Sequence, residues 1–175
     1  MKASILSRNQ RYGNQVQSLL DSLNSYSEEQ LNRKPADGGW SPMQVLHHLI
    51  LSEELSMAYV RKKMGFTSEF ENNNASARLR SLLLWLSLNM PFKYAAPRAI
   101  GSENLPEHAT LADTRTKWQE ARRVWDDFFE QLPVDLSNKL VYKHPRAGKV
   151  TWLQMLAFFE THLARHRKQI FRNLR

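Results

Sequence analysis

The sequence predicts an all-α protein whose main helices form an antiparallel four-helix bundle. Apolar side chains recur every three or four residues along four separate stretches of the chain, which is the period of an amphipathic helix. Breakers such as Pro35 and Pro133 fall between these stretches. No longer run alternates apolar and polar residues as a half-buried strand would. Four substantial helices joined by loops are most simply packed as a bundle.

The first predicted helix runs from about Gln10 to Leu23, with its apolar residues at helical spacing. A short capped helical turn is expected at 25–31, and two glycines then make a loop of 36–40. The second main helix should start at Ser41 and Pro42, because a serine hydroxyl caps free N–H groups and proline is tolerated in the first turn. Its apolar stripe continues to about Met64.

Residues 66–107 read as an extra insertion of helix and loop between the second and third main helices. Within it, 77–87 is predicted to be helical and 91–98 to be an extended loop. The sequence does not decide whether this insertion shapes a pocket or a surface for a partner.

The third main helix is predicted from Thr114 to Leu132, where Pro133 stops it. A short extended piece is expected near 139–142. Thr151 should cap the last helix, and Gln154 three residues later fits a capping box.

Length and composition limit the class of protein. The 175 residues fit one domain, 1–175, with 42% hydrophobic and 24% charged residues. The absence of cysteine leaves His, Asp and Glu as ligands for a transition metal. Neither an export signal nor a membrane-spanning run is seen, so we expect a cytoplasmic protein without a membrane partner. The net charge of +8 permits nucleic-acid binding, but no aromatic and basic motif accompanies it.

A pair of histidines on the last helix is the sharpest chemical signal. His162 and His166 are four residues apart and therefore lie on one helix face, within reach of one metal ion. They continue the apolar stripe, and a shared metal would remove the cost of burying them. The competing interpretation is a pair of surface histidines in a basic helix, because this spacing is common by chance.

The second helix offers a third ligand. His47 and His48 point about 100° apart, so one of them should face the bundle axis. Periodicity alone does not choose between them, because apolar residues flank both.

Three segments in order resemble the DinB-like proteins. The first is TrpSerProMetGlnValLeuHisHisLeu at 40–49, followed by Glu53. The second, LysHisProArgAlaGlyLysValThr at 143–151, is similar to the loop before their last helix. The third, HisLeuAlaArgHisArgLysGlnIle at 162–170, resembles their closing element.

The resemblance implies a four-helix bundle with a metal held by three histidines. The family's ligand lies eight positions after the tryptophan, which selects His48, and the other two ligands map onto His162 and His166. Zinc or nickel is the expected ion, with iron, copper or manganese as further candidates. Glu53 is a candidate for a residue that supports a ligand histidine, or for a general base. A glutamate at this position is more often a surface group.

The resemblance also implies a function, which is a metal-dependent hydrolase or a transferase that activates a low-molecular-weight thiol. The partners would be a small-molecule substrate and such a thiol, and a homodimer is compatible with a bundle of this kind. Two alternatives remain, a stress-associated binding protein whose metal is structural and a nucleic-acid-binding protein. Four other residues are weaker candidates for lining the site or orienting a ligand: His144, Arg146, Arg165 and Gln169.

Overall fold

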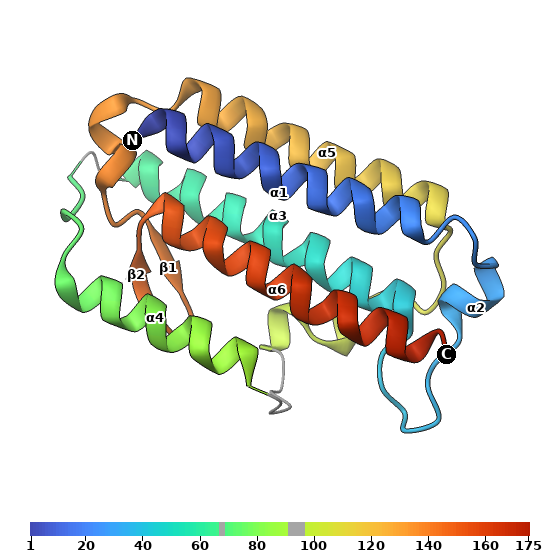
Figure 1. Ribbon diagram of the computed structural model, residues 1–175. Coiled ribbons are helices and arrows are strands. Elements are labelled where there is room, and N and C mark those ends of the chain that lie inside the picture. Colours follow the sequence, from blue (N-terminus) through green and yellow to red (C-terminus); the bar gives the residue numbers. More distant parts are fainter. Residues whose placement is uncertain (67–68, 91–96) are drawn as a thin grey trace.

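The computed structural model describes residues 1–66, 69–90 and 97–175, and it is mainly helical (Figure 1). The four long helices are α1 (Lys2–Ser22), α3 (Pro42–Phe66), α5 (Leu111–Gln131) and α6 (Trp152–Asn173). The shorter elements are α2 (Glu28–Asn32), α4 (Ala75–Asn89), the 3-10 helices η1 (Arg98–Ile100), η2 (Ser102–Asn104) and η3 (Val134–Asn138), and the strands β1 (Tyr142–His144) and β2 (Gly148–Val150). The predicted four-helix bundle is confirmed.

The directions of the long helices follow from one long connection. In the bundle α1 and α6 run one way and α3 and α5 run the other way (Figure 1). The connection that leaves α3 carries α4, η1 and η2 back along the bundle, so α5 starts at the same end as α3. Both α1 and α3 pack against α5 and α6, which gives each helix one parallel and one antiparallel neighbour. The insertion predicted from the sequence is this crossover.

Side-chain caps fix where the two helices that carry histidines begin. The Thr151 hydroxyl accepts a hydrogen bond from the backbone N–H of Gln154, whose side chain accepts one from the N–H of Thr151. The predicted capping box is therefore present. Ser41 and Gln44 exchange the same pair of hydrogen bonds, each 3.1 Å long, at the start of α3. These caps set the register from which His48 and the α6 histidines project.

Two helix starts differ from the sequence predictions. Helix α1 begins at Lys2 and not near Gln10, because Ile5 and Asn9 extend its buried face towards the N-terminus. Helix α5 begins at Leu111 and not at Thr114, because the side chain of Thr110 caps it. In both cases the apolar stripe was located correctly, but about two turns at the start of α1 and about one turn at the start of α5 were missed.

The connection before α6 forms a small hairpin. Strand β1 pairs with β2 in antiparallel register, with Lys143 opposite Lys149. The extended piece expected near 139–142 therefore begins at Tyr142 and runs two residues further. Of the loop predicted at 91–98, residues 91–96 lie outside the described part of the chain, and Arg98 begins η1.

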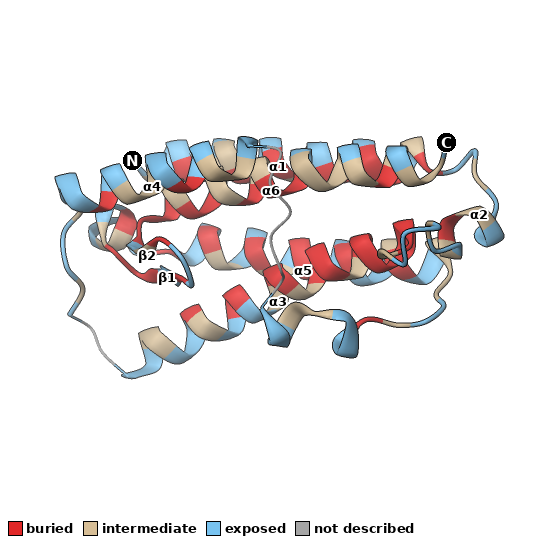
Figure 2. Ribbon diagram, turned by 90° about the horizontal axis from the view of Figure 1, so that it is seen from below, coloured by how far each residue is buried: buried red, intermediate tan, exposed pale blue. Residues whose placement is uncertain are grey.

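The buried residues line the inward faces of the long helices, whereas much of α4 is exposed (Figure 2). The largest fully buried side chains include Trp118, Trp125, Trp152 and Phe159. These aromatic residues therefore pack the core. Within the described residues, no helix is both long enough and apolar enough to cross a membrane.

Candidate metal centre

Three histidines from two helices converge inside the bundle. His48 comes from α3, and His162 and His166 come from α6. One ring nitrogen from each lies within 4.8 Å of the others. The Nε2 atoms of His48 and His162 are 3.2 Å apart. Only 3% of His48 and 9% of His162 is exposed, so these two imidazoles are shielded from water, whereas His166 is partly exposed.

Helical geometry explains why these histidines meet. His162 and His166 are one turn apart on α6, and their ring centroids are 4.6 Å apart. Helix α3 packs against this face of α6 and places the ring of His48 4.9 Å from that of His166. Phe158, one turn before His162, stacks on the His162 ring at 5.1 Å and fixes its plane.

Hydrogen bonds on the outer ring nitrogens leave the inner ones free to bind a cation. The Nδ1 atom of His48 lies 2.9 Å from the carbonyl oxygen of Ile100, so Nδ1 carries the proton and donates it. The Nδ1 atom of His166 lies 2.8 Å from Oε1 of Gln169 and donates in the same way. The Nε2 lone pairs then point inwards, as in metal sites whose ligands are oriented by outer partners.

Burial keeps these imidazoles neutral. It is the largest cause that lowers the pKa of His48 and lowers that of His162 well below the usual value. The pKa of His166 falls to about 3, mainly through burial and then through the neighbouring His48. Neutral imidazole is the form that binds a metal, so the cluster is ready for an ion near neutral pH.

The separation of one pair of ring nitrogens, those of His48 and His162, matches a tetrahedral ion. With metal–nitrogen bonds of 2.0–2.1 Å, two tetrahedral ligand atoms lie about 3.3 Å apart. The Nε2 atoms of His48 and His162 meet this requirement at 3.2 Å. Two lone pairs at that distance repel each other unless a proton or a cation lies between them. The cluster therefore fits a metal ion, and all-nitrogen ligation suits a transition metal.

A sequence profile described as the DinB superfamily matches residues 12–170. The chain belongs to the DinB superfamily. No curated protein and no solved structure matches the chain significantly. The match extends from α1 into the last turns of α6 and includes all three histidines.

In this DinB protein the histidines line a cavity of about 340 Å³. Its walls come from α3, α4, α6, the segment around η1 and the β1–β2 hairpin. Sequence reasoning missed one contributor: the carbonyl of Ile100, which orients His48, lies in the insertion that could not be interpreted. A backbone carbonyl leaves no side-chain signal, so no motif could have identified it.

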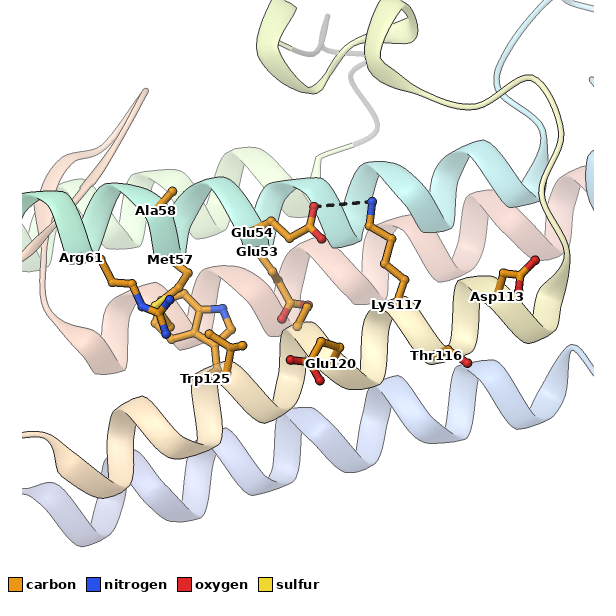
Figure 3. Close-up of a pocket in the computed structure, with 12 residues that line it drawn as sticks. Glu53, Glu54, Met57, Ala58, Arg61, Asp113, Thr116, Lys117, Glu120 and Trp125 are labelled. Atoms are coloured by element: carbon orange, nitrogen blue, oxygen red, sulfur yellow. Dashed lines mark ion pairs between the residues drawn. The ribbon is translucent and has the colours of Figure 1, made fainter.

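Glu53 lies outside both the histidine cluster and the cavity that it lines. It is 1% exposed and accepts hydrogen bonds from the hydroxyl of Tyr12 at 2.6 Å and from Nε1 of Trp118 at 2.8 Å. Nη1 of Arg122 donates to it at 2.9 Å. Figure 3 shows Glu53 beneath a groove of about 570 Å³ between α3 and α5, whereas the histidine cavity is not lined by Glu53. These contacts support a role in packing, and a general-base role remains only a prediction.

Some of the other candidate residues line the cavity, and others lie outside it. His144, Arg146 and Arg165 line the cavity. His47 points to α5, where its Nε2 lies 3.0 Å from the hydroxyl of Thr114. The structure thus places His48 and not His47 in the cluster. His108 is exposed.

Replacing Gln169 with alanine tests whether its hydrogen bond orients a ligand. The Gln169→Ala variant leaves Nδ1 of His166 without its partner, and we expect the affinity for zinc to fall by about 10- to 100-fold. Competition with a chromophoric chelator measures this change. Lys168→Ala changes the exposed neighbouring residue and should keep the original affinity. A change of less than twofold in Gln169→Ala would show that His166 needs no such support.

The buried histidines make the stability of the metal-free protein depend on pH. Their pKa values are lowered on folding, so the unfolded chain binds protons that the folded chain does not. The stabilisation is complete above the unfolded pKa of about 6.5 and is lost as the pH falls below it. Each such histidine contributes at most about 1.4 kcal/mol per pH unit.

Urea unfolding of the metal-free protein between pH 7.5 and 5.0 measures this dependence. The free energy of unfolding should fall more steeply in the wild type than in His166→Gln, which lacks one of the groups. Carboxylates titrate mostly below this window, so their contribution is small. Identical slopes for the two proteins would contradict the lowered pKa of His166.

Proposed function

We propose that the protein is a metal-dependent enzyme, either a hydrolase or a transferase that uses a low-molecular-weight thiol. A single divalent ion, zinc or nickel, would be held by His48, His162 and His166. The observation that carries the proposal is that three neutral imidazoles converge in the wall of a cavity. Three protein ligands leave a coordination position for water or substrate, which distinguishes reactive from structural sites.

The ion would supply a nucleophile, because binding to it lowers the pKa of water or of a thiol towards neutrality. The chain's own residues hold and shield the site. The carbonyl of Ile100 orients His48, and Gln169 orients His166. Phe158 and Leu84 line the cavity beside them and limit the access of bulk water.

A non-catalytic binding protein with a structural metal is the second candidate. One observation favours it: among the described lining residues there is no Asp or Glu that could act as a general base. A thiol reaction needs such a base less than hydrolysis does, because a metal-bound thiol is already acidified. If this candidate is correct, His48→Ala lowers the thermal stability without removing any activity.

Metal analysis and a substrate screen test the proposal. Protein purified without an affinity tag should contain close to one equivalent of a transition metal, or take it up when zinc or nickel is added. Less than a tenth of an equivalent after that addition would defeat the metal site. A broad screen for hydrolysis and thiol transfer should find turnover that disappears in His166→Ala while the circular dichroism spectrum is retained. A screen without such turnover supports the binding protein.

A further inference from the structure

Helix α4 carries most of the large apolar side chains that the described part of the chain exposes. Of the ten such residues in the described ranges, six lie between residues 79 and 90. They are each between 45% and 57% exposed: Leu79, Leu82, Leu83, Trp85, Leu86 and Met90. Single exposed leucines are normal on a protein surface, whereas a group of this size marks a contact with another surface.

Five of these residues form one line along the helix, which we call the leucine stripe: Leu79, Leu82, Leu83, Leu86 and Met90. Their spacings of three and four residues place the side chains within about 60° of one direction around the helix axis. The leucine stripe covers about three turns of α4. An apolar line of this kind is typical of a helix that packs along another helix.

The opposite side of α4 is already occupied. It packs against α6 and β2 (Figure 1), and Ala77 and Leu84 are buried there. Leu84 and Leu88 on this side also line the histidine cavity. The leucine stripe therefore faces away from the bundle.

The charges of α4 favour one orientation for a pair of such helices. The helix has no acidic residue, and Arg80 is turned to the hairpin, where its Nε donates to the carbonyl of Ala147 at 2.8 Å. Arg78 is exposed near the N-terminal end. A parallel pair would place Arg78 beside its own counterpart, whereas an antiparallel pair separates the two by about 13 Å along the axis, beyond the screening length of about 8 Å in physiological salt. Each Arg78 then lies towards the C-terminal end of the other α4, which has no basic residue in its last turn and whose dipole favours a cation.

The exposed apolar area is sufficient for two copies of the chain. A fully exposed side chain of this size presents roughly 150–250 Å², so the six residues at about half exposure offer on the order of 500 Å². Two copies would bury about 1,000 Å² of apolar surface, and with the polar residues around it this reaches the lower limit of about 1,200 Å² for specific interfaces. No other helix of the described chain carries more than two exposed large hydrophobic residues. The surface that matches the leucine stripe is therefore the same stripe on a second copy, which gives a closed two-fold pair.

We propose that the leucine stripe is an interface with a second copy of this chain, in which two α4 helices pack antiparallel about a two-fold axis between Leu82 and Leu83. Each Leu79 then faces Leu86 of the other copy. The inference goes beyond the proposed function, because it concerns assembly and requires neither metal nor activity. Since the other side of α4 is a wall of the histidine cavity, the pair would also hold that wall in place.

Sedimentation equilibrium of the full chain without a tag tests the proposal. We expect the wild type to form a dimer with a dissociation constant in the micromolar range, because the interface is near the lower size limit. Leu83→Glu should weaken the dimer by about tenfold or more, since it buries a charge without a partner. Val134→Glu is the matched control, because it makes an exposed apolar residue outside α4 acidic and should leave the dimer unchanged. Both positions are exposed, so the fold should persist, which circular dichroism checks.

Two double variants test the antiparallel arrangement. In Leu79→Glu/Leu86→Lys, each introduced charge would face the opposite charge of the second copy, so the dimer should persist. In Leu79→Glu/Leu86→Glu, each introduced charge would face a like charge, so the dimer should weaken by about tenfold or more. Monomers from both variants would contradict the antiparallel arrangement.

A wild type that stays monomeric at high micromolar concentrations would overturn the proposal, and so would a dimer that Leu83→Glu leaves unchanged. A membrane surface is the other possible occupant of an exposed apolar helix. If the protein is monomeric and binds vesicles of phosphatidylserine and phosphatidylcholine, and Leu83→Glu removes that binding, the leucine stripe contacts lipid and the proposal is wrong. The failure of the proposed function is distinguishable, because it would appear as a dimer that takes up no metal.

Discussion

Replacing His48 with alanine should weaken zinc binding at least 100-fold, which corresponds to roughly 3 kcal/mol of binding free energy. His48 is the only one of the three ligands that comes from α3, so its loss leaves two imidazoles on a single helix. Two neutral ligands cannot enclose the ion, and solvent would complete its coordination. Equilibrium dialysis against zinc, with metal quantified by mass spectrometry, measures the change.

His47→Ala is the matched control, because it removes the neighbouring imidazole by the same substitution. His47 contacts Thr114 on α5 and lies outside the cluster. Its replacement should leave zinc affinity within about twofold, with at most a small loss of stability from one hydrogen bond. Equal losses of affinity in the two variants would indicate a nonspecific effect of changing α3, and the assigned ligand set would then be wrong.

Replacing Glu53 with glutamine should lower the free energy of unfolding by about 3 kcal/mol, because it leaves Arg122 as a buried cation without its main partner. The side chain of Arg122 is 7% exposed, and its Nη1 lies 2.9 Å from Glu53. This loss of stability should lie at the lower end of the range for broken buried ion pairs, because Asp126 lies 3.6 Å from the same guanidinium and still offsets part of its charge. Urea unfolding of the metal-free protein measures it.

Glu54→Gln provides the comparison, because it makes the same substitution at the next residue. Its carboxylate is 3.7 Å from the ammonium of Lys117, and the side chain is 37% exposed (Figure 3). Exposed pairs of this kind contribute about 0–1 kcal/mol. Zinc stoichiometry should stay unchanged in both variants. If Glu53→Gln keeps its stability and loses only turnover, Glu53 acts in catalysis and the structural role argued from its contacts is contradicted.

Much of the fold and the pairing of two histidines on one face of α6 could be predicted from local patterns. The spacing of apolar residues identified the long helices, and the interval between His162 and His166 placed them on one face. The choice of His48 over His47 did not come from periodicity, because apolar residues flank both histidines. It came from the position of Trp40 in the family motif, and the structure places the Trp40 ring 4.8 Å from that of His48.

The remaining features depend on contacts between distant segments. The partners of Glu53 come from α1 and α5, and no spacing within α3 indicates that they surround it. Five residues separate Glu53 from His48, which turns the two side chains about 140° apart on a helix. The cavity is assembled from five separate parts of the chain, among them the crossover.

A crystal structure of the zinc-loaded protein with anomalous diffraction at the zinc edge tests the metal centre most directly. The expected result is one strong peak 2.0–2.2 Å from a ring nitrogen of each of His48, His162 and His166. Zinc bound only at surface residues, or rings turned away from one another in the loaded crystal, would contradict it.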